Sequence, residues 1–218
     1  MSWVAAVIRL MTNARSSPDG IPRGGRTTRI TILNGNPSAK PVAFDGYLSA
    51  LSQLLQERNH TAILHPLRQM DIRYCVGCLD CWVRTPGKCV VSDGSAVLCR
   101  DFINSDIVLF ASPIIMGFTS ALLKRAHDKL LPLVHPYFEW VGAEMHHMAR
   151  YPTYPRIALL LQREEDSTGE DIEIITDIYR RTAINLKTSF VYSWETNRSA
   201  QEVADEIDGL QRVPARRS

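Results

Sequence analysis

Four cysteines lie close together in the middle of the chain, in a pattern that suits an iron–sulfur cluster. They are Cys75, Cys78, Cys81 and Cys89, separated by two, two and seven residues. Three thiolates at successive two-residue intervals can surround one compact cluster, and a fourth from further along the chain completes the ligand set. Structural zinc sites usually use two separated C-x2-C pairs, so the triplet favours iron–sulfur over zinc. Reduced thiols packed in a loop beside Trp82, without a metal, are the other interpretation.

The distribution of cysteines along the chain indicates a reduced protein. There are five cysteines, an odd number, and four of them fall within fifteen residues, whereas a secreted disulfide scaffold would spread them. Since disulfides are rare in the cytoplasm, we expect free thiols and a cytoplasmic location. The fifth cysteine, Cys99, falls on a predicted helix, where it would serve as a small core residue.

A polar loop after the first apolar stretch is a candidate phosphate site. Residues 34–40 read Asn-Gly-Asn-Pro-Ser-Ala-Lys and lead into a predicted helix. Unpaired backbone N–H groups and the helix dipole favour anions at such a place. The candidate binding residues are Asn34, Asn36, Ser38 and Lys40. An ordinary connection between a strand and a helix is the alternative that the loop by itself leaves open.

A second candidate loop, residues 112–120, is unusually apolar. It follows a predicted strand end, where a polar turn is expected. Backbone N–H and C=O groups there can meet the edge of a flat heterocycle, while Met116 and Phe118 cover its face. The candidate contacts are Pro113, Ile114, Ile115, Met116, Gly117 and Phe118. A buried hydrophobic turn is the alternative.

Apolar patterning predicts the elements that must position these loops. Five short apolar strands are expected at 30–33, 61–64, 107–111, 157–161 and 190–192, with Ser112-Pro113 ending the third. Helices are expected from Pro41 to Asn59, after a cap at Asp93, from Ser120 to Leu131, over 172–186 and over 200–210. This alternation predicts an α/β fold, a flavodoxin-like doubly wound five-stranded parallel sheet of order 2-1-3-4-5. Ligands of such sheets bind where the order reverses, at the loops after strands one and three.

The formal charge of +2 is unevenly distributed and gives no sign of nucleic acid binding. Residues 1–29 carry five Arg and one Asp, and residues 211–218 carry three Arg, which leaves −5 for residues 30–210. No run approaches the roughly 18 apolar residues that a membrane helix needs. We expect a domain over 29–210, a basic tail over 211–218, and a disordered or mis-annotated extension over 1–28. Neither nucleic acid nor a membrane is an expected partner.

The chain resembles the flavodoxin-fold NAD(P)H-dependent FMN reductases over about residues 29–195, and especially their iron–sulfur flavoprotein branch. The most specific part is the run from Cys75 to Trp82, followed by residues 85–89 and Asp93. The second part is the run 112–117, followed by Leu123-Lys124 and Asp128. The resemblance implies that loop 34–38 holds the FMN phosphate, that loop 113–118 holds the isoalloxazine ring, and that the cysteines hold a 4Fe–4S cluster.

The implied function is an FMN-dependent oxidoreductase. Electrons would pass from NAD(P)H through the flavin, and through a cluster where one is bound, to a quinone, flavin or protein acceptor; no catalytic side chain is assigned. One alternative is a non-enzymatic electron carrier with the same cofactors. Another is a cofactor-poor binding module whose cysteines hold zinc or nothing. The acidic segment Glu164–Asp166 favours this last alternative, because many members of the family have a glycine-rich loop there.

Residues 132–155 are long for a connection between a helix and a strand, and they are rich in aromatic residues. They could form a lid, a substrate wall or a subunit contact. The resemblance suggests that a neighbouring subunit brings its flavin to the cluster, since both centres must be close for electron transfer. We therefore expect a homodimer or homotetramer, with Tyr137, Phe138 and Trp140 near the subunit contact or the shared site.

Overall fold

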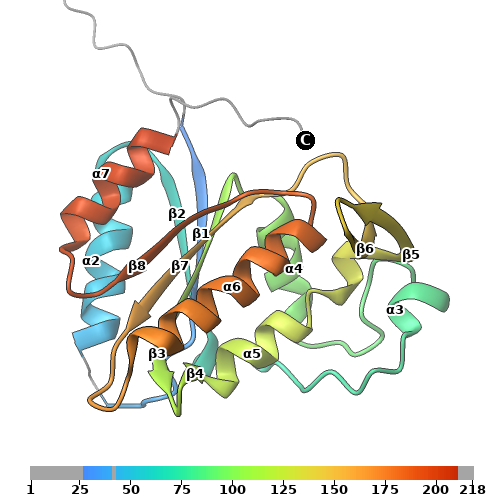
Figure 1. Ribbon diagram of the computed structural model, residues 1–218, viewed down its shortest axis with the longest axis horizontal. Helices are drawn as coiled ribbons and strands as arrows, with labels where there is room; N and C mark the ends of the chain where they lie inside the picture. Colours follow the sequence, from blue (N-terminus) through green and yellow to red (C-terminus); the bar gives the residue numbers. More distant parts are fainter. Residues whose placement is uncertain (1–26, 41–42, 211–218) are drawn as a thin grey trace, which may run out of the picture.

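A parallel sheet with helices on both faces forms the centre of the molecule (Figure 1). The computed structural model describes residues 27–40 and 43–210, so the expected tail and nearly all of the expected extension lie outside the described residues. The sheet order is β2-β1-β3-β7-β8, and all four strand pairings along it are parallel. The strands are β1 (Arg29–Asn34), β2 (Thr61–Pro66), β3 (Ile107–Ile115), β7 (Arg156–Gln162) and β8 (Phe190–Glu195). The predicted flavodoxin-like order is confirmed.

Two hydrophobic cores explain why these strands are apolar on both sides. Helices α2 (Ala43–Glu57) and α7 (Ala200–Leu210) cover one face, where Ile32 and Leu109 are fully buried. Helices α4 (Ser95–Ile103), α5 (Ala121–Asp128) and α6 (Gly169–Asn185) cover the other, where Leu33, Val108 and Phe110 are fully buried. Successive residues of a strand point to opposite faces, so a strand buried on both faces must be apolar throughout.

The helix starts follow the capping signals in the sequence. The N-cap of α5 is Ser120, whose hydroxyl accepts a hydrogen bond from the backbone N–H of Leu123 at 3.1 Å. The carboxylate of Asp93 accepts one from the N–H of Ser95 at 2.9 Å, where α4 begins. Helix α5 ends at Asp128 rather than at the expected Leu131. A separate 3-10 turn, η3 (Leu131–Leu133), begins at Leu131.

The expectation that Ser112-Pro113 ends the third strand is wrong. Strand β3 continues to Ile115 and pairs antiparallel with the short strand β4 (Phe118–Thr119). In a β-strand the N–H and C=O of one residue point towards the same neighbouring strand. Those of the next residue point towards the strand on the other side. The carbonyl of Ala111 accepts a hydrogen bond from the N–H of Gly35, directly after β1. Pro113, two residues later, therefore faces the β1 side as well, at a point beyond the end of β1. The missing N–H of proline therefore costs no ladder hydrogen bond.

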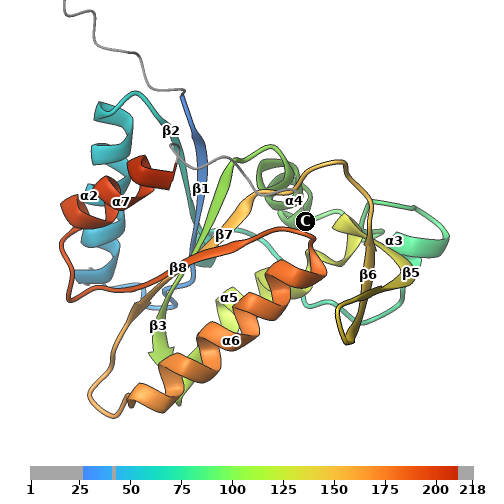
Figure 2. The same cartoon turned by 45° about the horizontal axis from the view of Figure 1, so that its top comes forward.

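Two further elements lie at the end of the molecule farthest from α2 (Figure 2). The cysteine segment contains a single-turn helix, α3 (Asp80–Val83), and a 3-10 turn, η2 (Leu67–Gln69), precedes the segment. Residues 132–155 contain an antiparallel hairpin, β5 (Val134–Val141) and β6 (Glu144–Ala149), which forms a separate two-stranded sheet. None of the described helices is long and apolar enough to cross a membrane.

Candidate functional site

The loops after β1 and β3 meet at the carboxyl ends of the strands, as the sheet order predicts. The N–H of Gly35 donates to the carbonyl of Ala111 at 2.8 Å, and the hydroxyl of Ser120 donates to the carbonyl of Gly35 at 2.5 Å. A Cβ atom at position 35 would lie 2.6 Å from the Cβ of Leu123. Glycine is therefore required here, because the loop after β1 packs directly against the start of α5.

The polar side chains of the loop after β1 converge on Asp45 of α2. The amides of Asn34 and Asn36 donate to its carboxylate at 2.7 and 3.1 Å, and Arg68 donates to it at 3.0 Å. Burial raises the pKa of Asp45, but the hydrogen bonds from Arg68, Asn34 and Asn36 outweigh it and hold this pKa below its usual value. This set of donors suits an anion, and the anion that it holds is the protein's own carboxylate.

The backbone of the same loop is also largely satisfied from within. Side-chain oxygens of Asn34, Asn36 and Ser38 each accept a hydrogen bond from the N–H two residues later, at 2.9, 3.0 and 3.2 Å. Both asparagines are 3% exposed, whereas Ser38 is half-buried and Lys40 is exposed. Of the four predicted phosphate-binding residues, only Ser38 and Lys40 thus have side chains that solvent reaches.

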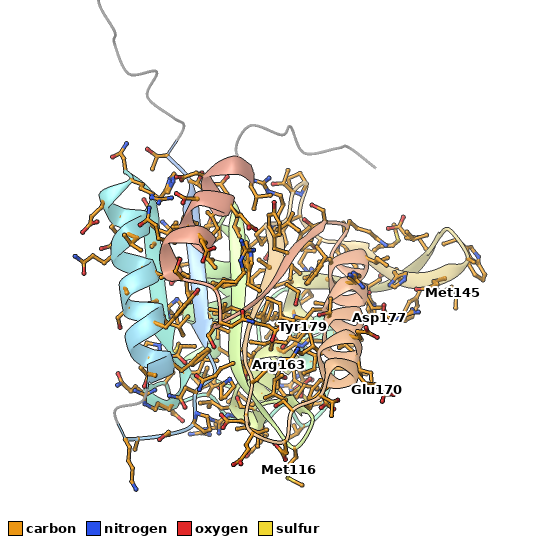
Figure 3. The ribbon with its side chains drawn as sticks, turned by 60° about the vertical axis from the view of Figure 1, so that its left-hand side comes forward. Met116, Met145, Arg163, Glu170, Asp177 and Tyr179 are labelled. Atoms are coloured by element: carbon orange, nitrogen blue, oxygen red, sulfur yellow. The ribbon has the colours of Figure 1, made fainter. Side chains whose placement is uncertain are left out.

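The apolar loop after β3 is a tight hairpin turn rather than an open loop. Met116 and Gly117 have φ values of 51° and 74°, typical of a two-residue turn between antiparallel strands. Figure 3 shows Met116 at the lower edge of the molecule. Ile115 is 39% exposed and Met116 is 93% exposed, while Ile114 is buried. The turn therefore presents two apolar side chains to solvent at the carboxyl edge of the sheet.

The segment after β7 adds negative charge to this edge. Arg163 forms an ion pair with Glu195 at the end of β8. The three acidic residues Glu164–Asp166 that follow are exposed. The hydroxyl of Ser167 accepts a hydrogen bond from the N–H of Glu164 at 3.0 Å, which shapes the segment as a turn before α6. The only positive side chain of this segment is thus engaged with a neighbouring carboxylate.

The four clustered cysteines line one pocket. All are free thiols: Cys81 on α3 is buried, Cys89 is half-buried, and Cys75 and Cys78 are exposed. Burial raises the pKa of the Cys81 thiol, and the proximity of Cys89, Cys75 and Cys78 raises it further. Residues in the left-handed region, Gly77, Leu79 and Gly87, let the chain turn sharply around this pocket.

The fifth cysteine does not belong to that pocket. The Cys99 thiol lies within hydrogen-bond range of the carbonyl of Lys129, with its sulfur 3.2 Å from the oxygen. Burial raises its pKa to about 12, so it stays a protonated thiol at neutral pH. The sequence-based separation of Cys99 from the other four agrees with this arrangement.

No single-ion metal site is formed by the cysteines in their present positions. Within residues 27–40 and 43–210, no group of three or more His, Cys, Asp or Glu side chains converges on a point that could hold a metal ion. One zinc ion would require its sulfur ligands at about 2.3 Å from a shared centre. A 4Fe–4S cluster takes four thiolates, and the four cysteines line one pocket here.

A buried lysine that the sequence analysis did not single out lies beside the cysteine pocket. Lys129 follows α5, its side chain is 2% exposed, and its ammonium lies 3.1 Å from the carboxylate of Asp93. The same nitrogen lies 3.6 Å from the sulfur of Cys89. A sequence pattern gives no signal for this contact, because forty residues separate Lys129 from Cys89.

The β5–β6 hairpin is attached to the cysteine segment through aromatic rings. His147 of β6 packs against Trp82 at a centroid distance of 5.0 Å and stacks on Phe138 at 4.5 Å. The Trp82 indole N–H lies 3.2 and 3.1 Å from the carbonyls of Leu131 and Val134, at the base of the hairpin. The hairpin and the cysteine pocket therefore form one unit.

This unit carries a large exposed apolar surface. The three aromatic residues singled out from the sequence are 57–71% exposed: Tyr137, Phe138 and Trp140. Met145, at the far tip in Figure 3, is 60% exposed, and Val76 in the cysteine segment is 79% exposed. Apolar surface of this extent is typical of an interaction site. Figures 1 and 2 place the unit at the opposite end of the molecule from α2.

Comparison with solved structures finds the same fold. An FMN-dependent NADH-azoreductase from Bacillus anthracis, solved in complex with FMN, matches with a TM-score of 0.58 and 11% identity, over 85% of this chain and 98% of that chain. RosB, solved with bound 8-demethyl-8-formylriboflavin-5'-phosphate, matches with a TM-score of 0.59 and 14% identity, over 85% and 79%. An NAD(P)H:quinone oxidoreductase from Methanothermobacter marburgensis matches with a TM-score of 0.55 and 15% identity, over 85% and 95%.

Identities this low establish the fold and nothing finer. No protein-family model matches the chain, and no curated protein matches it in sequence. The fold is flavodoxin-like, with the two strand-end loops at the position where such sheets bind their ligands.

Proposed function

We propose that the protein is an FMN-dependent NAD(P)H oxidoreductase that delivers electrons to a quinone, flavin or protein acceptor. The observation that carries the proposal is the joined pair of loops at the reversal of the sheet order, tied by the Gly35 hydrogen bonds to Ala111 and Ser120. Structures of the same fold hold FMN or a flavin phosphate.

The phosphate and the ring of a flavin each have candidate contacts at this edge. Ser38 and Lys40, just before α2, supply a hydroxyl and a positive charge for the phosphate. The exposed apolar side chains of Ile115 and Met116 suit the face of the isoalloxazine ring. A bound flavin supplies hydride acceptance from reduced nicotinamide and the release of electrons one at a time. The chain's own residues need only bind, orient and shield, so no side-chain acid or base is assigned.

We further propose that Cys75, Cys78, Cys81 and Cys89 hold a 4Fe–4S cluster. Three observations support it: the four thiols line one pocket, they are reduced, and Cys99 is excluded from the set. Thiolates are the usual ligands of such clusters, which transfer single electrons. The close triplet favours a cluster over zinc, whose structural sites usually use two separated C-x2-C pairs.

The exposed apolar hairpin supports a homo-oligomer. Helix α5 starts beside the loop after β1, at the Ser120–Gly35 hydrogen bond, and ends at the cysteine pocket, so its length separates the two proposed sites within one chain. A second copy that covers Phe138 and Trp140 would bury the exposed aromatic surface and bring its own strand-end loops near the cluster.

Cofactor analysis of anaerobically purified protein tests the main proposal. We expect bound or readily bound FMN, and iron and sulfide in amounts close to four per chain. We also expect steady consumption of NADH or NADPH when a quinone is present. Protein that binds FMN but never oxidises a nicotinamide would be an electron carrier. Colourless protein that takes up neither FMN nor iron would refute the proposal and favour the binding module that the acidic segment Glu164–Asp166 suggests.

Cysteine variants test the cluster separately from the flavin. Cys89→Ser removes one of the four proposed ligands, so most cluster iron and its redox signal should be lost while FMN binding is kept. Cys99→Ser is the matched control, since its thiol faces the carbonyl of Lys129 instead, and it should keep both cofactors. Equal iron content in the two variants would contradict the ligand assignment.

A further inference from the structure

Lys129 and Asp93 form an ion pair that is almost completely removed from solvent. The two side chains are 2% and 0% exposed, and nitrogen and oxygen lie 3.1 Å apart. Burying a lysine and an aspartate together costs desolvation energy that their attraction only partly returns. A pair of this kind therefore calls for an explanation beyond the stability of the fold.

The carboxylate does not depend on the lysine for its hydrogen bonds. Asp93 already accepts from the N–H of Ser95 at 2.9 Å, from the hydroxyl of Ser95 at 2.5 Å and from the N–H of Arg73 at 3.0 Å. These three bonds come from the segment between η2 and α3 and from the start of α4, so they fix the carboxylate in place. Asp93 thus acts as a rigid anchor for the ammonium of Lys129.

The lysine has donors left for the cysteine pocket. An ammonium has three N–H groups, of which the carboxylate uses one. The nitrogen lies 3.6 Å from the sulfur of Cys89, and Lys129 lines the same pocket as the four cysteines. The other charged residue on the wall, Asp128, forms an ion pair with Lys124 of α5. Lys129 is therefore the buried cation that faces the thiols directly.

We propose that Lys129, anchored by Asp93, is a positioning residue for the cysteine-bound cluster. Its ammonium donates a hydrogen bond to the Cys89 thiolate and offsets the negative charge that the cluster gains on reduction. Hydrogen bonds to the ligand sulfurs and local charge are two of the factors that set a cluster's reduction potential. Reduction would add one electron from the proposed reduced flavin, with no bond made or broken and no proton moved, and the fixed positive charge favours that reduced form. This inference rests on the cluster proposed above.

Redox titration of the iron-loaded protein, followed by electron paramagnetic resonance, tests the inference. Lys129→Met keeps the length and apolar stem of the side chain but removes the charge and the donor. We expect it to retain iron and sulfide and to shift the cluster's reduction potential to more negative values. Lys129→Arg restores the charge and should recover most of the shift. Arg198→Met removes one positive charge from an ion pair with Glu206 of α7, on the opposite face of the sheet, and should leave the potential unchanged.

Each result decides one question. An iron-loaded Lys129→Met protein with the wild-type potential would overturn the inference while leaving the proposed cluster intact. Wild-type protein without iron and sulfide would overturn the cluster itself, and this inference with it. If Lys129→Met does not fold, Lys129→Gln decides: its amide still donates to the sulfur but carries no charge. The inference then requires a potential below that of the wild type, and an unchanged potential overturns it.

Discussion

Replacing Gly35 with alanine tests whether the two strand-end loops depend on their close contact. The new Cβ would lie 2.6 Å from the Cβ of Leu123, 3.0 Å from the hydroxyl of Ser120 and 3.1 Å from the carbonyl of Ala111. Two of these atoms cannot rotate away, because one is a Cβ and the other belongs to the backbone. Overpacking of this kind costs about 1–3 kcal/mol, and loss of the Gly35–Ala111 hydrogen bond costs about 1 kcal/mol more.

The expected loss of stability is measurable by thermal or urea unfolding. A destabilisation of about 2–4 kcal/mol lowers Tm by roughly 4–16 °C for a protein of this size. FMN affinity should fall in the same variant, because the loop can no longer rest against α5. Gly46→Ala is the matched control: it lies inside α2, and a Cβ there would meet no atom within 4 Å. It should raise stability by about 0.5–1 kcal/mol and leave FMN binding alone.

The reasoning fails if Gly35→Ala is as stable as the wild type. It also fails if Gly46→Ala loses as much stability as Gly35→Ala, since the cost would then come from the change of residue type. Full stability together with lost FMN binding would place Gly35 in direct contact with the flavin instead.

Three further predictions concern the phosphate loop, acid stability and assembly. Ser38→Asp keeps an oxygen that can accept from the N–H of Lys40 but adds a negative charge, so it should abolish FMN binding, whereas the uncharged Ser38→Asn should not; unchanged affinity in the aspartate variant argues against the phosphate assignment. Burial raises the pKa of Asp93, but hydrogen bonds from Ser95 and Arg73 and the contact with Lys129 outweigh it and lower this pKa to about 2. A lowered carboxyl pKa contributes stability that is full above the unfolded value of 3.8 and is lost as pH falls towards 2. Acid unfolding curves should therefore show a decline between pH 4 and pH 2 that Asp93→Asn reduces, and equal declines would contradict the assignment. Sedimentation should show at least a dimer at micromolar concentration, with Trp140→Glu shifting it towards the monomer, and a monomeric wild type would rule this out.

The sheet could be predicted because its strands are buried on both faces. Runs such as Ile107–Ala111 and Ile157–Leu161 are continuously apolar, and their alternation with helical periodicity leaves few possible topologies. The start of a helix at Ser120 could also be predicted, because the capping hydrogen bond joins Ser120 to Leu123, only three residues further along the chain. The position of both candidate loops at one edge of the sheet then follows from topology.

Elements that depend on a particular neighbour could not be predicted in this way. The break expected at Ser112-Pro113 is wrong because the effect of a proline depends on whether a strand lies on the side it faces. The β5–β6 hairpin was missed because its side chains are largely exposed and lack the apolar alternation of a half-buried strand. Both errors concern the surroundings of a residue rather than its own preference.

At the two candidate sites, too, local features could be predicted from the sequence, whereas contacts between distant residues could not. The sequence grouped four cysteines by their close spacing and set Cys99 apart because it falls on a predicted helix. Folding alone placed the Asp45 carboxylate among the asparagines of the loop after β1, and Lys129 against Cys89. Such contacts join residues eleven and forty positions apart, and their electrostatic effect depends on distance and burial. Neither quantity is present in a sequence until the chain has folded.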